Sequence, residues 1–137
     1  MLQATIGSLI DRFGARQMLA AGLFVNAAAI AAMGLVDGYW GFAVLAVVAG
    51  IGNAVFHPVD YAIIAAKITE KRLGRAYSLH TFSGFLGGGM APVAIVGLAA
   101  LFDWRMAFIL VGLAGVAAAI VIACQGDTLE GEAPAPK

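Results

Sequence analysis

Long apolar runs separated by short polar segments are the dominant pattern in this chain. Segments 17–36, 40–66, 76–102 and 106–123 are almost free of charged residues. About twenty apolar residues are enough to cross the roughly 30 Å hydrocarbon core of a bilayer. None of the segments shows the strict alternation of barrel strands. The pattern therefore predicts four membrane-spanning helices and an all-α integral membrane protein, built as a polytopic helical bundle.

The composition agrees with this fold class. Apolar residues make up 62% of the chain and charged residues 12%, whereas soluble domains usually have about 25% charged residues. The single cysteine, Cys124, excludes an internal disulfide and a cysteine-built metal site. Residues 1–10 are apolar but too short to span, so we expect the end of a truncated helix and hence a fragment or a late-started reading frame. Residues 124–137 are acidic and rich in proline and alanine, which predicts a disordered cytoplasmic tail.

The distribution of charge predicts an orientation. Loop 11–16, a polar hinge at 67–75 and the tail lie on one side of the membrane, because an even number of spans separates them. That side holds seven of the eight Lys and Arg residues, and the other side holds only Arg105. Positive charge favours the cytoplasmic side, and Trp40 and Trp104 fall at the opposite face, where interfacial aromatic residues are common. We expect an integral protein of a bacterial inner (plasma) membrane.

Loop 11–16 and the residues before it form a compact charged motif, Gly7-Ser-Leu-Ile-Asp11-Arg12-Phe-Gly14-Ala-Arg16. Gly14 permits a sharp reversal of the chain, and the arginines favour the anionic cytoplasmic leaflet. The motif resembles the loop G-x-L-x-D-R-x-G-x-R/K-x, which joins the second and third helices of major facilitator superfamily transporters. The resemblance implies that this loop acts as a conformational latch. The alternative is a topogenic loop that only orients the chain.

The resemblance covers residues 7–123. It implies a partial N-terminal six-helix domain, from the end of helix two through helix six, with the C-terminal half of the transporter missing. Trp104-Arg105-x-x-Phe108 also resembles the start of the sixth helix of this superfamily. Two departures count against a drug/proton antiporter. The usual fourth-helix arginine is absent, and the glycine-proline motif of the antiporters is matched only loosely.

A polar stripe marks the second span. Asn53, His57 and Asp60 are spaced i, i+4 and i+7, so they share one helix face, and Tyr61 lies beside them. Ionisable residues within a span are costly and usually face the bundle interior or a water-filled cavity. These residues are therefore candidates for substrate contact or proton coupling, although Asp60 is also close enough to the helix end to lie in the interface. Pro58 should kink this helix.

The glycine pattern of the third span predicts close packing against a neighbouring helix. The pattern Gly84-x-x-x-Gly88 permits a neighbouring helix to approach closely, and Pro92 follows it; we favour packing over gating for these residues. His80 lies near the cytoplasmic end, where a hydrogen bond to a loop is the default expectation. In the first span, Asn26 is predicted to form a hydrogen bond between helices.

These patterns favour one function over its alternatives. The chain carries no catalytic motif, no carboxylate cluster for a metal and no basic patch for nucleic acid, so we predict no enzyme activity, no cofactor and no metal. The prediction is a secondary active transporter that moves a small solute by alternating access, coupled to protons or another ion. The expected partners are membrane lipid, the solute, protons and the missing half. The alternative is a noncatalytic membrane scaffold or regulatory subunit, or an inactive transporter remnant.

Overall fold

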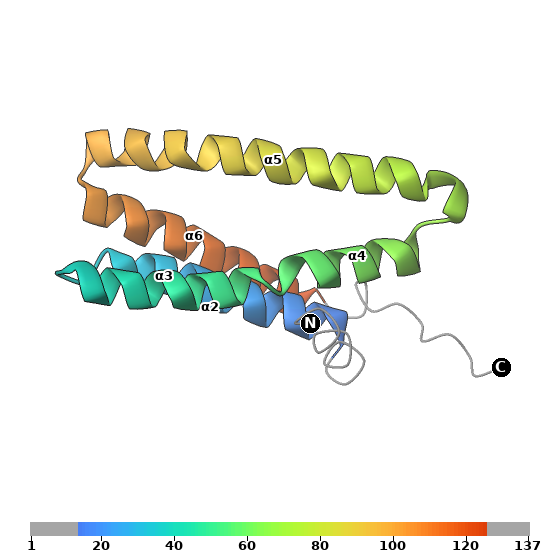
Figure 1. Ribbon diagram of the computed structural model, residues 1–137, viewed down its shortest axis with the longest axis horizontal. Coiled ribbons are helices and arrows are strands. Elements are labelled where there is room, and N and C mark those ends of the chain that lie inside the picture. The colour runs from blue at the N-terminus through green and yellow to red at the C-terminus, as the bar shows by residue number, and fades with distance from the viewer. Residues whose placement is uncertain (1–13, 126–137) are drawn as a thin grey trace.

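The computed structural model describes residues 14–125. This part of the chain is a bundle of helices (Figure 1), namely α2 (Ala15–Met33), α3 (Tyr39–Asn53), α4 (Phe56–Lys67), α5 (Glu70–Leu101) and α6 (Trp104–Cys124). The expected truncated helix at 1–10, most of loop 11–16 and nearly all of the expected tail lie outside the described residues.

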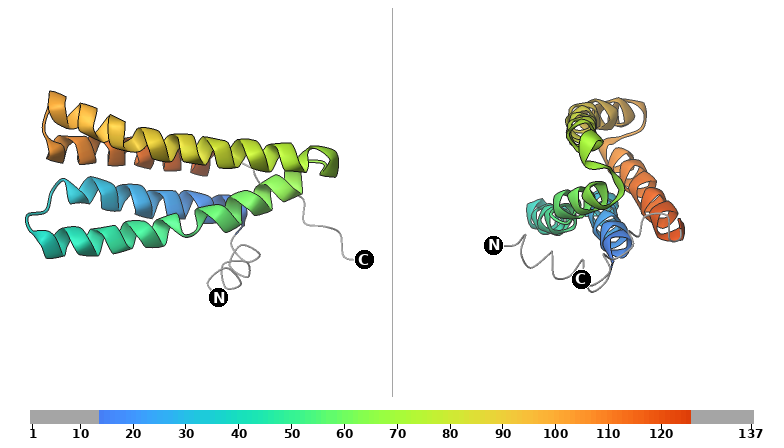
Figure 2. Two further views of the ribbon diagram at one scale, coloured as in Figure 1. Left: turned by 45° about the horizontal axis from the view of Figure 1, so that its top comes forward. Right: turned by 90° about the vertical axis from the view of Figure 1, so that its right-hand side faces the viewer.

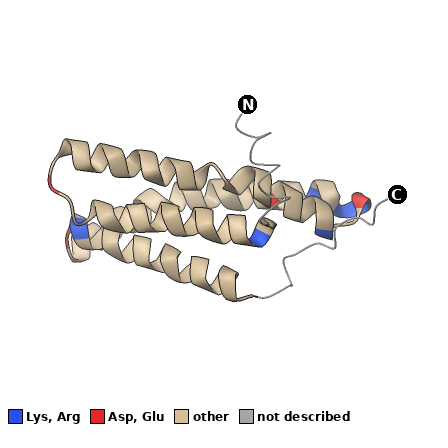
Figure 3. Cartoon of the chain, turned by 90° about the horizontal axis from the view of Figure 1, so that it is seen from below, with Lys and Arg blue, Asp and Glu red and all other residues tan. Residues whose placement is uncertain are grey.

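In the part of the chain that the structure describes, four helical segments are long and apolar enough to cross a membrane. They are Ala15–Met33, Tyr39–Lys67, Glu70–Leu101 and Trp104–Cys124, the second of which combines α3 and α4. The prediction of an all-α, polytopic integral membrane protein is therefore confirmed. Charged residues gather mainly at the two ends of the bundle, leaving an apolar middle (Figure 3).

The third span starts earlier than its apolar run. Helix α5 begins at Glu70, inside the segment 67–75 that the sequence predicts to be a polar hinge. Thr69 has an extended backbone and is the last residue before the helix. Glu70 places a carboxylate in the first helical turn, where a negative charge is stabilised by the positive end of the helix macrodipole. Polar residues therefore continue the helix beyond the apolar segment, so the hinge is reduced to a short turn.

Helix α2 forms the centre of the bundle, with α3 and α6 packed against it. Small residues bring the backbones together. A methyl group placed on Gly112 of α6 would lie 2.4 Å from the backbone nitrogen of Ala31, and one on Gly115 would lie 2.7 Å from the Cβ atom of Ala27. A methyl group on Gly52 of α3 would lie 2.6 Å from the backbone nitrogen of Asn26. Close contact through small residues is a common way in which membrane helices associate.

Asn26 joins α2 to α3. Its side-chain amide donates a 2.8 Å hydrogen bond to the carbonyl oxygen of Ala49. The predicted hydrogen bond between helices is therefore confirmed. Such a bond satisfies an amide that would otherwise be costly within an apolar bundle.

Arg105 joins the start of α6 to the turn between α2 and α3. Its guanidinium donates to the carbonyl oxygens of Gly34 and Val36, at 3.3 and 3.2 Å, and forms an ion pair with Asp37. The same guanidinium lies 4.5 Å from the ring centre of Trp104. The two turns at this end of the bundle are therefore held together by one side chain.

Helix α5 lies along one side of the molecule. It adjoins α6 at one end and α4 at the other (Figures 1 and 2), and none of its residues is buried. This arrangement leaves α5 as one wall of a space whose opposite wall is α4 and the end of α3.

Candidate functional site

The polar stripe lies where the second span is interrupted. Helix α3 ends at Asn53, residues 54 and 55 form a turn, and α4 begins at Phe56. In a continuous helix, the residue at position 58 would donate a hydrogen bond to the carbonyl of Ala54. Pro58 has no N–H, and its ring clashes with that carbonyl. The regular pattern resumes directly afterwards, since Val59 donates to the carbonyl of Val55 at 3.3 Å.

An ion pair connects the two walls of the site. The Nε2 atom of His80, on α5, lies 3.4 Å from Oδ2 of Asp60, on α4. The side chains are 32% and 23% exposed, respectively, so both are partly shielded while remaining accessible from the space between the helices. The imidazole carries a positive charge only when it is protonated. The attraction between the two side chains therefore depends on their protonation states.

A cluster of aromatic rings lies beside the ion pair. The ring of Tyr61 contacts the rings of Tyr77 and His80 edge to face, with centroids 5.2 and 5.9 Å apart, and lies 6.1 Å from the ring of His57. The hydroxyl of Tyr77 also donates to the backbone carbonyl of Tyr61 at 3.5 Å. Edge-to-face contacts of this kind favour a defined ring orientation. They hold α4 and α5 together at this level of the bundle.

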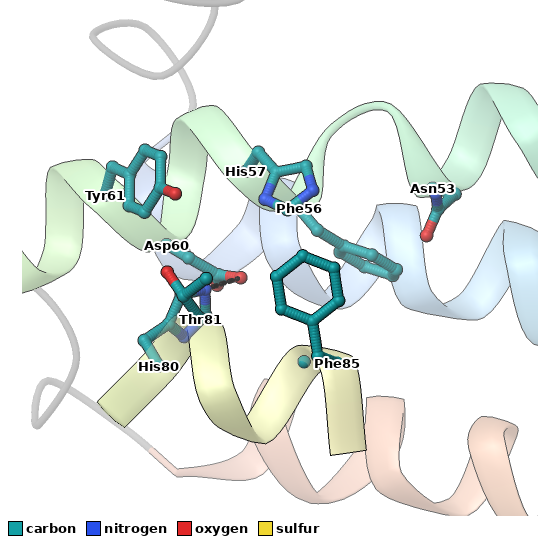
Figure 4. Close-up of a pocket in the computed structure, with 9 residues that line it drawn as sticks. Asn53, Phe56, His57, Asp60, Tyr61, His80, Thr81 and Phe85 are labelled. Atoms are coloured by element: carbon teal, nitrogen blue, oxygen red, sulfur yellow. Dashed lines mark ion pairs between the residues drawn. The ribbon is translucent and has the colours of Figure 1, made fainter. Parts of the chain in front are cut away.

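All of these side chains except Tyr77 line one pocket of about 520 Å³ (Figure 4). All of the predicted stripe lies on it, and α5 contributes the opposite wall. The lining residues are Asn53, Phe56, His57, Asp60, Tyr61, His80, Thr81, Gly84 and Phe85. In Figure 4, His80 and Asp60 point toward each other from the two helices, and the ring of Phe85 projects from α5 toward α4. The pocket is thus a mostly apolar cavity with a few polar side chains, and it lies between two membrane spans.

His80 has a different partner from the expected one. The sequence favoured a hydrogen bond to a loop, whereas the structure pairs His80 with the Asp60 carboxylate. One signal could have pointed to this pair, because an acid and a base that both lie within spans satisfy each other at lower cost than either does alone. The sequence does not reveal that the two helices are adjacent at this level.

The expected close packing at Gly84 and Gly88 is not found within the described residues. A methyl group on either glycine would meet no atom within 4 Å beyond its own helix. Gly84 instead lines the pocket. Pro92 lies within α5, which continues past it without interruption.

The described part of the charged loop begins at Gly14. This residue has a φ angle of 82°, a left-handed conformation that favours glycine. Arg16 lies in the first turn of α2 and donates to the carbonyl oxygen of Ala123 at 3.4 Å, near the end of α6. Gly7, Asp11 and Arg12 lie outside the described residues, so the latch role of the loop stays a prediction.

Within residues 14–125, no three His, Cys, Asp or Glu side chains are grouped so that they could hold a metal ion.

Comparison with known proteins gives one family. Residues 1–134 match the family model described as "Major Facilitator Superfamily". The chain is 29% identical over 118 residues to the probable L-galactonate transporter of Escherichia coli, covering 86% of this chain and 26% of that protein. It is 28% identical over 121 residues to the multidrug resistance protein MdtH of Cronobacter sakazakii, covering 88% of this chain and 28% of that protein.

The chain therefore spans about a quarter of the length of these curated relatives. No solved structure matches it.

Proposed function

Because the chain belongs to the major facilitator superfamily, we propose that it forms part of a secondary transporter that moves a small solute by alternating access. The observation that carries the proposal is the Asp60–His80 pair, which places an acid and a base 3.4 Å apart in a pocket between two membrane spans. Ionisable groups within membrane spans are expensive and characteristically serve ion or substrate pathways.

Proton coupling follows from the chemistry of the pair. A carboxylate and an imidazole can together hold different numbers of protons, and each state changes the attraction between α4 and α5. His57, one helical turn before Asp60, lines the same pocket and provides a second imidazole. A solute that enters the pocket competes for these groups, so binding the solute and binding protons become linked.

Transport requires further membrane helices beside those of this chain. The support is α5, none of whose residues is buried although its sequence is apolar enough to span. Alternating access involves the movement of one group of helices against another around a central site. The relatives suggest two solute classes to examine, namely a sugar acid and a drug-like compound.

Reconstitution tests this function. We expect proteoliposomes that contain the chain alone to accumulate no solute, whereas a carrier that joins it to the remaining helices of the superfamily fold should move a solute in response to an imposed proton gradient. The measurement is uptake of radiolabelled sugar acids and drugs, with a pH-sensitive dye to record linked proton movement.

Gradient-driven uptake by the chain alone would contradict the need for further helices. A correctly inserted carrier that moves none of the solutes would favour the alternative of a noncatalytic membrane subunit.

The proposed orientation places the α4–α5 turn in the cytoplasm and the turns at Asp37 and Asp103 outside. The support is the concentration of Lys and Arg around the start of α5. After Cys124 is replaced by serine, single cysteines at 37 and 103 should react with an impermeant maleimide on intact spheroplasts, and a cysteine at 71 should react only after permeabilisation. Labelling in the opposite pattern would reverse the orientation.

A further inference from the structure

We propose that the pocket between α4 and α5 selects organic cations that carry an aromatic or apolar body, with Asp60 as the anionic contact. The inference rests on the proposed function, because it assigns a solute class to the same site. It is carried by the charges and rings that line the pocket.

The charge of the lining favours a cation. Among the described residues, Asp60 is the one carboxylate that lines the pocket, and neither a lysine nor an arginine of this part of the chain lines it. The basic groups there are His57 and His80, which are charged only when protonated. A solute anion would therefore meet Asp60 with no permanent positive charge to balance it. A solute cation would gain an ion pair that is stronger than in water, because the surroundings have a lower dielectric constant.

The rings of the lining suit the body of such a solute. Phe56 and Tyr61 come from α4, and Phe85 projects from α5 on the opposite side (Figure 4). Aromatic faces attract cations through their quadrupole and also remove apolar surface from water. The volume of about 520 Å³ is within the range of about 300–1,000 Å³ typical of small-molecule sites.

His80 would compete with a bound cation for the Asp60 carboxylate. Its Nε2 atom already lies 3.4 Å from the Asp60 carboxylate, so an incoming cation must compete with the imidazole for this carboxylate. Cation binding would thus weaken the contact between α4 and α5 at this level. Removing the imidazole should strengthen cation binding, since the carboxylate would no longer have a competitor.

Two probes of similar shape and opposite charge test the proposal. Phenyltrimethylammonium and benzenesulfonate each carry a tetrahedral group on one phenyl ring. Their binding to the whole chain in zwitterionic nanodiscs is measured by isothermal titration calorimetry, with empty nanodiscs subtracted. We expect the cation to bind at least about tenfold more tightly than the anion, which is the ratio given by a single modest interaction.

The variants locate the source of this preference. Asp60→Asn should remove the preference, His80→Ala should increase cation affinity severalfold, and Glu70→Gln should change neither. Glu70 is an exposed acid outside the pocket, so it is the matched control for loss of one negative charge. Circular dichroism verifies that each variant retains its helices.

If the two probes bind equally to the unaltered chain, or if the anion binds more tightly, the proposal is wrong whatever the variants show. A cation preference that survives Asp60→Asn would overturn the role of Asp60. Transport by the reconstituted carrier is measured separately, so an incorrect solute class would leave the proposed coupled transport intact.

Discussion

Asp60→Asn should abolish proton-driven solute accumulation by a carrier that contains this chain, while leaving its membrane insertion unchanged. The asparagine side chain has nearly the same size but cannot take up or release a proton. It also removes the charge that attracts His80 across the pocket, where the two side chains lie 3.4 Å apart. We expect a decrease of more than about tenfold in the accumulation ratio, equivalent to more than ~1.4 kcal/mol of lost coupling.

The measurement is solute uptake into proteoliposomes under an imposed proton gradient, compared with solute exchange at equal pH on both sides. Exchange should persist if the variant still binds solute, because exchange requires no net proton movement. Glu70→Gln is the matched control, since this acid is exposed and lies outside the pocket. Normal accumulation by Asp60→Asn, with an unchanged pH profile, would remove Asp60 from the proton pathway.

Gly112→Val should destabilise the described bundle strongly, whereas Gly88→Val should not. A Cβ atom at position 112 would lie 2.4 Å from the backbone nitrogen of Ala31, and backbone atoms cannot move aside as a flexible side chain can. Overpacking of this kind costs about 1–3 kcal/mol even where the surroundings relax. A Cβ atom at position 88 would meet nothing within 4 Å, and valine has a slightly higher helix propensity than glycine.

The two substitutions are chemically identical and both fall within membrane-spanning helices, so each serves as the control for the other. Thermal unfolding of the chain in detergent micelles, followed by circular dichroism, compares them. We expect a clearly lower midpoint for Gly112→Val and an unchanged or slightly higher midpoint for Gly88→Val. Similar midpoints would show that the contact of α2 with α6 does not hold this bundle together.

Much of the site was predictable because it depends on spacing along one segment. The i, i+4 and i+7 spacing predicted that Asn53, His57 and Asp60 share one face, and all of them line the pocket although the helix is interrupted between Asn53 and Phe56. The break before Pro58 is equally local, since a proline interrupts the hydrogen bond that its own nitrogen would have made. No such rule could identify His80 as the partner of Asp60, because this contact joins two different helices.

The sequence by itself determined the class of the protein and the approximate position of each span, because hydropathy is a property of consecutive residues and the bilayer sets a minimum length for them. It also determined that Asn26 needs a partner, since an amide within an apolar bundle must be satisfied. Tertiary structure alone decided which small residues allow close packing, among them Gly52, Gly112 and Gly115 against α2, rather than Gly84 and Gly88. Every glycine in a span has the same local sequence signal, and only the position of the neighbouring helix decides whether the missing side chain is needed.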